Sequence, residues 1–202
     1  AWAALVGEDE FGCFADLQVE SVTQCLRLIK PVNQSAFWMA DTPCTQALWL
    51  EVMGKNPAEF ASNSQNPVER VSWADVQRFL NQLNQTTPEL QARLPSEKEW
   101  ELACQAGMDA PYSFGDKLTT EHANIAGTAT TIVKSFPANS YGLYDMHGNI
   151  WEWCEDDADS WGNQKVLRGG CWALDAEAAR SDSRGQSAVA NRDYTIGFRF
   201  VI

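Results

Sequence analysis

Four oxygen donors lie close together in the sequence between Asp145 and Glu152. The two acidic side chains supply carboxylates, and the backbone carbonyls of Gly148 and Ile150 lie between them, so the four groups can converge on one hard cation. Oxygen-only ligands of this kind suit calcium. The alternative is that Glu152 pairs with an arginine and that the neighbouring tryptophans belong to the core, since aromatic side chains bury a large apolar surface. The spacing is compatible with either arrangement.

The segment that carries these donors, residues 142–154, must contain both turns and a strand. Gly142 and Gly148 suit backbone turns that would strain other residues. Trp151 and Trp153 then alternate with other residues in the two-residue period of a strand. We therefore expect the donors to lie where a tight turn leads into a strand.

The cysteines and histidines offer few ligands for a transition metal. The six cysteines are too sparse for a disulfide scaffold, and none has the CxxC spacing of zinc or thioredoxin-like sites. We expect mostly buried thiols, with Cys13–Cys25 as one candidate disulfide. The two histidines are His122 and His147, so an iron site of two histidines and one carboxylate is a formal alternative.

A cysteine nucleophile is the other enzymatic hypothesis, because Cys154 and Cys171 lie among aromatic residues. Reactive thiols need an electropositive setting or a neighbouring base. The acidic run 155–157 follows Cys154 directly and would raise the pKa of its thiol. We therefore expect both cysteines to be structural and buried.

Composition and charge exclude several classes of function. The net charge of −12 makes a surface for nucleic acid or anionic membrane improbable, because both need clustered lysine and arginine. No run of about 18 apolar residues occurs, so we expect no membrane insertion, and residues 1–6 are too short for the apolar part of a signal peptide. The compartment stays open, with the cell surface or periplasm favoured over the cytoplasm.

The length of 202 residues suits one domain, residues 1–202. Residues 1–36 read as a lead-in and linker with an alternating run, residues 15–22, that predicts an edge strand. Residues 42–54 predict a short helix, and helices also begin after the capping hydroxyls of Ser72 and Ser96.

From residue 108 onward, glycine, asparagine and short aromatic runs predict short strands joined by long loops that are functional or held by ions. The expected fold is α+β, with few helices, small antiparallel sheets and much ordered loop.

Five blocks resemble, in the same order, the formylglycine-generating enzyme family, or sulfatase-modifying factor domain. These are PVERVSW (67–73), RLPSEKEW (93–100), GLYDMHGNIWEW (142–153), RGGCW (168–172) and GFRF (197–200). The resemblance covers residues 37–202 and implies a C-type-lectin-like fold with little regular secondary structure. It also implies a calcium ion held by the side chains of Asp145 and Glu152 and the carbonyls of Gly148 and Ile150, with aspartate in place of the usual asparagine adding charge. A second family calcium site is matched at 124–125 but lacks its later acidic element.

The oxidase of the family binds copper(I) through two cysteines that follow a Gly-Gly-Ser-Tyr motif, and soft thiolates suit that ion. Here the motif reads Gly169-Gly170-Cys171-Trp172, and no cysteine follows it. The resemblance therefore implies a family member that lacks the copper pair, and we expect no copper.

The tail, residues 172–197, places small and polar residues between a few framing ones. Such a pattern fits a recognition surface on a rigid scaffold or an ordinary solvated loop. It resembles the variable region of lectin-fold proteins diversified by retroelements, although undiversified bacterial relatives share the same frame. The resemblance implies these diversified positions: Ala173, Leu174, Asp175, Ala178, Ser183, Gly185, Gln186, Ser187, Asn191, Asp193, Tyr194 and Thr195.

We therefore expect a non-catalytic domain that binds a ligand, most readily a protein, through residues 172–195, with calcium stiffening the loops. Trp172, Leu174 and Tyr194 would be apolar anchors. Directional contacts would come from Asp175, Gln186, Asn191, Arg192 and Asp193. Arginines expected to pair with core carboxylates are Arg168, Arg180, Arg184 and Arg199. Two alternatives stay open: a tailoring oxidase or maturation enzyme of the same family, and a regulatory partner of an envelope system. The oligomeric state stays open too.

Overall fold

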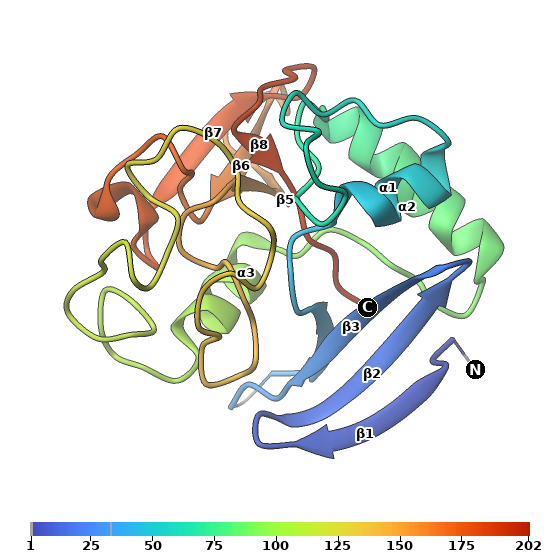
Figure 1. The fold of residues 1–202 in the computed structure, drawn as a ribbon, viewed down its shortest axis with the longest axis horizontal. Coiled ribbons are helices and arrows are strands. Elements are labelled where there is room, and N and C mark those ends of the chain that lie inside the picture. Colours follow the sequence, from blue (N-terminus) through green and yellow to red (C-terminus); the bar gives the residue numbers. More distant parts are fainter. Residues whose placement is uncertain (1, 33) are drawn as a thin grey trace.

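Two four-stranded sheets and a few helices form the fold in the computed structural model, which describes residues 2–32 and 34–202 (Figure 1). The first sheet is an antiparallel meander of β1 (Leu5–Asp9), β2 (Gly12–Val19), β3 (Val22–Ile29) and β4 (Phe37–Ala40). The second has the order β7-β6-β5-β8 and consists of β5 (Trp151–Asp157), β6 (Gln164–Arg168), β7 (Arg184–Ala188) and β8 (Ile196–Gly197). β8 pairs parallel with β5, and the other pairs are antiparallel.

Helices α1 (Gln46–Met53), α2 (Trp73–Thr86) and α3 (Glu97–Gln105) lie between the two sheets in the sequence, and a 3₁₀ helix, η1 (Ala176–Ala179), follows β6. Long loops connect the rest. The α+β class, the small sheets and the abundant loop agree with the expectation from the sequence. None of the helices in the described part of the chain has the length and apolar character needed to span a membrane.

The N-terminal segment is more regular than predicted. β2 lies between β1 and β3, so the run 15–22 does not form an edge strand, and most of residues 1–36 belong to a sheet rather than to a linker; Ala1 and Asn33 lie outside the described residues. The sequence did not reveal this sheet because β1 is mostly solvated, with Leu5 and Val6 both exposed. A strand without a buried face carries no alternating pattern for the sequence to reveal.

The candidate disulfide Cys13–Cys25 is not formed, and all six cysteines are free thiols. In the β2–β3 register, Cys25 lies opposite Asp16, three positions along β2 from Cys13. At about 3.4 Å per residue this separates the two cysteines by about 10 Å, which is beyond the reach of a disulfide. The prediction of this pair was therefore wrong.

Helices α2 and α3 begin where the capping residues predicted, whereas α1 begins at Gln46, four residues after the start of the predicted range 42–54. Thr45 accepts the backbone N–H of Leu48 at the start of α1, and Ser72 and Ser96 each form a complete capping box at α2 and α3. Gly54, with a φ of +74°, ends α1 in the left-handed conformation that glycine adopts readily. These local signals mark helix ends because each one satisfies backbone groups that a helix end leaves without a hydrogen-bond partner.

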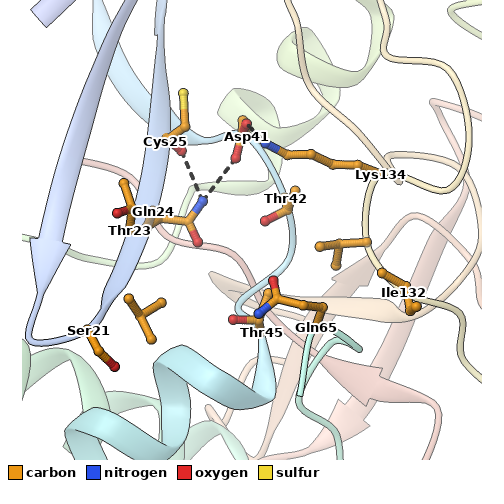
Figure 2. A pocket seen from close by; sticks show the side chains of 12 residues that line it. Ser21, Thr23, Gln24, Cys25, Asp41, Thr42, Thr45, Gln65, Ile132 and Lys134 are labelled. Carbon is orange, nitrogen blue, oxygen red and sulfur yellow. Dashed lines mark hydrogen bonds and ion pairs between the residues drawn. The ribbon is translucent and has the colours of Figure 1, made fainter. Parts of the chain in front are cut away.

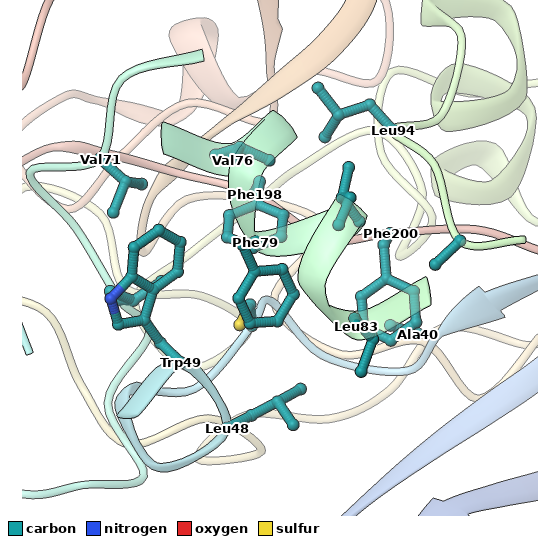
Figure 3. Packing of buried hydrophobic residues seen from close by; sticks show 14 of the residues in the cluster. Ala40, Leu48, Trp49, Val71, Val76, Phe79, Leu83, Leu94, Phe198 and Phe200 are labelled. Carbon is teal, nitrogen blue, oxygen red and sulfur yellow. The ribbon is translucent and has the colours of Figure 1, made fainter. Parts of the chain in front are cut away.

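The main core lies where α1 and α2 meet the C-terminal segment (Figure 3). Trp49 of α1 stacks on Phe79 of α2 with ring centroids 5.2 Å apart, and Phe198 packs edge-on against both rings. After β8 the chain runs beside β4 of the first sheet, where the carbonyl of Phe200 accepts the N–H of Ala40. The last residues thus tie the helices and the first sheet to the second.

A fully buried ion pair connects these parts. The guanidinium of Arg199 donates to both carboxylate oxygens of Glu152, at 2.7 and 2.8 Å, and both side chains are 0% exposed. Arg199 also donates to the carbonyls of Ala40 and Tyr144, and the indole N–H of Trp100 donates to Glu152 at 2.7 Å. β4, α3, β5 and the C-terminal segment therefore share one hydrogen-bonded centre.

Removing one charge of this pair should destabilise the fold strongly. We expect Glu152→Gln to lower the free energy of unfolding by about 3–5 kcal/mol, because Arg199 is then buried without a counter-charge. The double variant Glu152→Gln/Arg199→Met should recover a large part of the loss. Urea denaturation at neutral pH measures both. Glu59→Gln, which removes a partner of the exposed Arg70, is the control and should cost less than about 1 kcal/mol; equal losses for Glu152→Gln and the control would contradict the central role of the pair.

Candidate functional site

The predicted donor segment is a tight turn held by neighbouring loops. Asp145, Gly148 and Asn149 all have left-handed backbones, with φ of 56°, 82° and 60°. A Cβ at Gly148 would lie 2.4 Å from the carbonyl oxygen of Asn124, so only glycine fits there. The N–H of Gly148 donates to the carbonyl of Gly169 at 2.7 Å. The turn leads directly into β5, as the sequence predicted.

Asp145 is a buried acid with one unsatisfied oxygen. Its Oδ2 accepts the backbone N–H of Lys134 at 3.0 Å, while Oδ1 has no hydrogen-bond partner. Burial raises the pKa of Asp145 to about 6, although the Lys134 hydrogen bond and the charge of Arg199 act in the opposite direction. A buried carboxylate oxygen without a partner is costly, and a cation is one group that would satisfy it.

Glu152, the second carboxylate, is already paired with Arg199. The open alternative from the sequence, an ion pair with an arginine beside core tryptophan, is therefore present, and Trp153 is fully buried. Within residues 2–32 and 34–202, no three His, Cys, Asp or Glu side chains lie together as a metal-binding group. The fit to calcium is partial: Asp145 keeps one unpartnered oxygen, but the carbonyl of Gly148 accepts the N–H of Ile150 at 2.8 Å and the charge of Glu152 is neutralised by Arg199. The calcium site stays a prediction.

The two histidines do not form an iron site. His147 is buried, with Nδ1 2.7 Å from the carbonyl of Ala179 and Nε2 accepting the N–H of Ser113. Burial lowers the pKa of His147 to about 4, so the ring is neutral at neutral pH. The ring of His122 stacks on Phe114, which also contacts His147. His147 has no nitrogen left for a metal, and the formal iron alternative is not supported.

The thiols have the properties of structural cysteines. Burial raises the pKa of Cys104 to about 12 and raises those of Cys44 and Cys154 well above the usual range. The pKa of Cys171 is also raised by burial, and its side chain is 2% exposed. Thiols of this kind are protonated at neutral pH and are poor nucleophiles.

A loop next to the turn holds the start of the tail. Asn124 donates its side-chain amide to the carbonyl of Ala129 and to the side-chain oxygen of Asn149. The following Gly127 donates its N–H to the carbonyl of Trp172 at 2.6 Å. Side-chain amides therefore fix this loop at the position where the family resemblance offered a second calcium site, and the loop in turn fixes Trp172.

Two aromatic rings of the tail meet a third from a distant loop. Trp172 stacks against Tyr194 with centroids 5.9 Å apart, and Phe60 contacts both rings edge-on at 5.5 and 6.2 Å. We call Phe60, Trp172 and Tyr194 the aromatic platform. Tyr194 is 47% exposed, but Trp172 is 9% exposed. Trp172 is therefore buried and its ring supports Tyr194 from within, while its role as an apolar anchor for a ligand stays a prediction.

The platform rests on a buried acid that the sequence analysis did not single out. Glu69 is 0% exposed, and its Oε1 accepts the N–H of Phe60 at 2.8 Å, while Oε2 has no partner. Burial raises the pKa of Glu69 to about 7. Phe60 was also missed; its signal was a single aromatic residue in an otherwise polar loop, residues 54–67.

The remaining tail positions differ in exposure. Exposed positions are Ala173, Leu174, Asp175, Gln186, Asn191, Arg192 and Tyr194. Half-buried positions are Ala178, Ser183, Gly185, Ser187, Asp193 and Thr195. Their role in binding stays a prediction.

Four of the five side chains expected to make directional contacts are already bonded within the protein. Asp175 caps η1, Arg192 binds an aspartate of α2 at 2.7 Å, and Asp193 accepts the N–H of the residue two positions later. Gln186 is exposed on β7, and exposed Asn191 donates to a serine of the same strand. The side chains most available to a ligand are therefore fewer than expected.

The four arginines that were expected to pair with core carboxylates differ in their partners. Arg168 is 1% exposed, but its partner Glu101 is 36% exposed. Arg180 and Arg184 form ion pairs at the surface. Of the four, Arg199 alone pairs with a fully buried carboxylate.

Two kinds of similarity place the chain among known proteins. Its sequence matches the sulfatase-modifying factor enzyme 1-like domain over residues 21–202. It is 33% identical to the serine/threonine-protein kinase pkn1 of Chlamydia caviae, over 67% of this chain and 24% of that protein. It is 31% identical to the formylglycine-generating enzyme of Thermomonospora curvata, over 76% of this chain and 50% of that enzyme. The matched part thus spans half or less of each of these two relatives.

Among solved structures, variable protein 1 of Treponema denticola is similar with a TM-score of 0.83 and 26% identity, over 92% of this chain and 97% of that one. The U1 variant of the major tropism determinant has a TM-score of 0.54 and 15% identity, over 94% of this chain and 62% of that one. The second likeness concerns the fold alone. Because the domain profile matches nearly the whole chain and the fold agrees with it, the chain belongs to the sulfatase-modifying factor enzyme 1-like family, which includes the formylglycine-generating enzymes.

Proposed function

We propose that this domain is a non-catalytic family member that binds a protein ligand through the aromatic platform and the exposed tail positions beside it. The observation that carries the proposal is the platform itself, which joins the loop at Phe60 to both ends of the tail and presents Tyr194 at the surface. Leu174, 38% exposed, offers a further apolar contact. Aromatic side chains held rigidly at a surface lose little entropy on binding and are frequent hot spots of protein interfaces.

The chemistry of the thiols supports a function other than the oxidase reaction. A copper(I) site needs two thiolates, and Cys171 is a buried, protonated thiol with no cysteine after it in the chain. The similarity to variable protein 1, at 26% identity, supports the further proposal that the tail is diversified by a retroelement. One relative, of Bos taurus, is itself described as an inactive C-alpha-formylglycine-generating enzyme 2.

Calcium is the second part of the proposal. We propose that Asp145 and the carbonyls of Gly148 and Ile150 bind one ion, with Glu152 contributing weakly because Arg199 neutralises it. The unpartnered Oδ1 of Asp145 supports this assignment. Its role would be structural, since it would relieve a buried charge in the turn that precedes β5.

The ligand surface predicts a position-dependent cross-link. A photoreactive amino acid at position 174, 186 or 194 should capture the same host protein, identified by mass spectrometry, while one at Val6, which is 65% exposed on β1, should not. With the captured protein purified, Tyr194→Ala should weaken binding by about thirtyfold, the effect of losing about 2 kcal/mol at a hot spot. The thermal midpoint of the Tyr194→Ala variant should differ little from that of the wild type. Capture from Val6 alone, or undiminished binding by Tyr194→Ala, would refute the assignment.

Diversification predicts a pattern in natural sequences. Deep sequencing of codons 172–195 in a natural population of the organism that carries this gene should find substitutions concentrated at exposed positions such as 173, 174, 186, 191 and 194. Trp172 and Arg192 should be spared, because the first supports the platform and the second is paired with α2. An invariant tail would exclude diversification and leave a single fixed partner.

The calcium proposal predicts that Asp145→Asn changes the free energy of unfolding in opposite directions with and without calcium. The folded-state pKa of about 6 exceeds the ordinary aspartate pKa of 3.8, so the stability that protonated Asp145 contributes is complete below about pH 4 and is lost as the pH rises through about 6. In EDTA at pH 8, Asp145→Asn should therefore gain up to about 3 kcal/mol in unfolding free energy, and the gain should vanish near pH 4. Millimolar calcium should stabilise the wild type at pH 8 more than the variant.

The matched control for this measurement is Asp116→Asn, which alters an exposed acid and should change neither response. A wild-type thermal midpoint at pH 8 that is identical in EDTA and in calcium would rule out the ion at this turn.

A further inference from the structure

A cavity of about 400 Å³ lies between β3, the segment that leads from β4 into α1, and residues 132–134 (Figure 2). None of the residues that line it belongs to the aromatic platform or to the tail. Its volume is in the range of small-molecule sites, which are usually mostly apolar. This one differs, because hydroxyl and amide groups form much of its wall.

The charged groups of the wall cancel each other. Lys134 Nζ lies 2.6 Å from Asp41 Oδ2, and these are the one basic and the one acidic side chain of the lining. Gln24 donates its amide nitrogen to Asp41 Oδ1 at 3.0 Å and to the carbonyl of Cys25 at 2.9 Å. A ligand with a net charge would find no uncompensated counter-charge, so the wall fits a neutral molecule.

The polar groups are preorganised and mixed in character. Gln24 and Thr42 are 4% and 2% exposed, yet both line the cavity. Because the amide nitrogen of Gln24 is used by the wall, its side-chain oxygen is left as an acceptor, and Figure 2 shows this oxygen and the Thr42 hydroxyl facing the same open space. Gln65 adds an amide from the opposite side. The ligand must therefore both donate and accept hydrogen bonds at several points.

The lining contains no aromatic residue, and its aliphatic side chains are those of Val22, Ile132 and Val133. Flat aromatic ligands would have no ring to stack on. We infer that the cavity is a second binding site, separate from the proposed protein-binding surface, for a neutral, hydroxyl-rich small molecule of the size of one sugar ring or cyclic polyol.

Titration calorimetry and saturation-transfer NMR with glucose, galactose, mannose, N-acetylglucosamine and myo-inositol test this inference. At least one probe should bind with a dissociation constant near or below about 1 mM, and glucose 6-phosphate should bind less tightly than glucose. Ile132→Trp, which fills the cavity from a 43% exposed position, and Thr42→Val, which removes one hydroxyl, should each weaken binding by about tenfold or more. Met108→Trp, at a 45% exposed position outside the lining, is the matched control and should bind like wild type.

Tyr194→Ala separates this site from the proposed function, because it should leave sugar binding unchanged even if protein binding is lost. Three results would overturn the inference: no probe binds at up to about 50 mM, binding survives Ile132→Trp, or the phosphorylated sugar binds more tightly than the neutral one. Thermal midpoints of the variants verify that each one is folded.

Discussion

The buried ion pair between Glu152 and Arg199 is the constraint on which the rest of the structure depends. Taking both charges out of water is costly, and the cost is offset only when every remaining hydrogen-bonding group finds a partner. Arg199 meets this condition through Glu152 and two backbone carbonyls, and Glu152 receives a further hydrogen bond from Trp100. The position of each partner is therefore fixed by the pair, and these partners come from β4, α3, β5 and the turn that precedes β5.

The same ion pair leaves the carboxylate of Asp145 without a counter-charge. One guanidinium can compensate one carboxylate, and the geometry assigns it to Glu152 with two direct hydrogen bonds. Asp145 keeps a single hydrogen bond from a backbone N–H and an unsatisfied oxygen. With asparagine at this position there would be no second charge to bury, whereas aspartate, with its pKa raised to about 6, carries a buried charge at neutral pH that a bound cation would compensate. The unpartnered oxygen of Asp145 therefore supports the calcium proposal independently of the ion pair.

Local signals in the sequence predicted the helices and the turn into β5, because capping hydroxyls and turn glycines act over a few residues. The N-terminal sheet was missed, since β1 has no buried face to create a pattern. At the candidate site, the ion pair of Arg192 with α2 could not be predicted, because the tertiary fold brings the two residues together. Phe60 joins the aromatic platform from a loop more than 100 residues earlier in the sequence, and no local rule connects the two.

The tail combines fixed ends with an open middle, and this arrangement limits how it can vary. The carbonyl of Trp172 accepts the N–H of Gly127, and the carbonyl of Asp193 accepts the N–H of Arg70, so both ends are held by backbone bonds to segments outside the tail. Backbone bonds of this kind do not depend on which side chain the tail residue carries. Side chains between the ends can therefore change without loosening the loop, provided that they do not support the platform or pair with α2. Tyr194 belongs to the platform and is also available to a ligand. Its ring packs on Trp172 and Phe60, and nearly half of the residue is exposed to solvent. A ligand that binds there meets a surface whose rigidity comes from the fixed frame and whose chemistry comes from the residues between its ends.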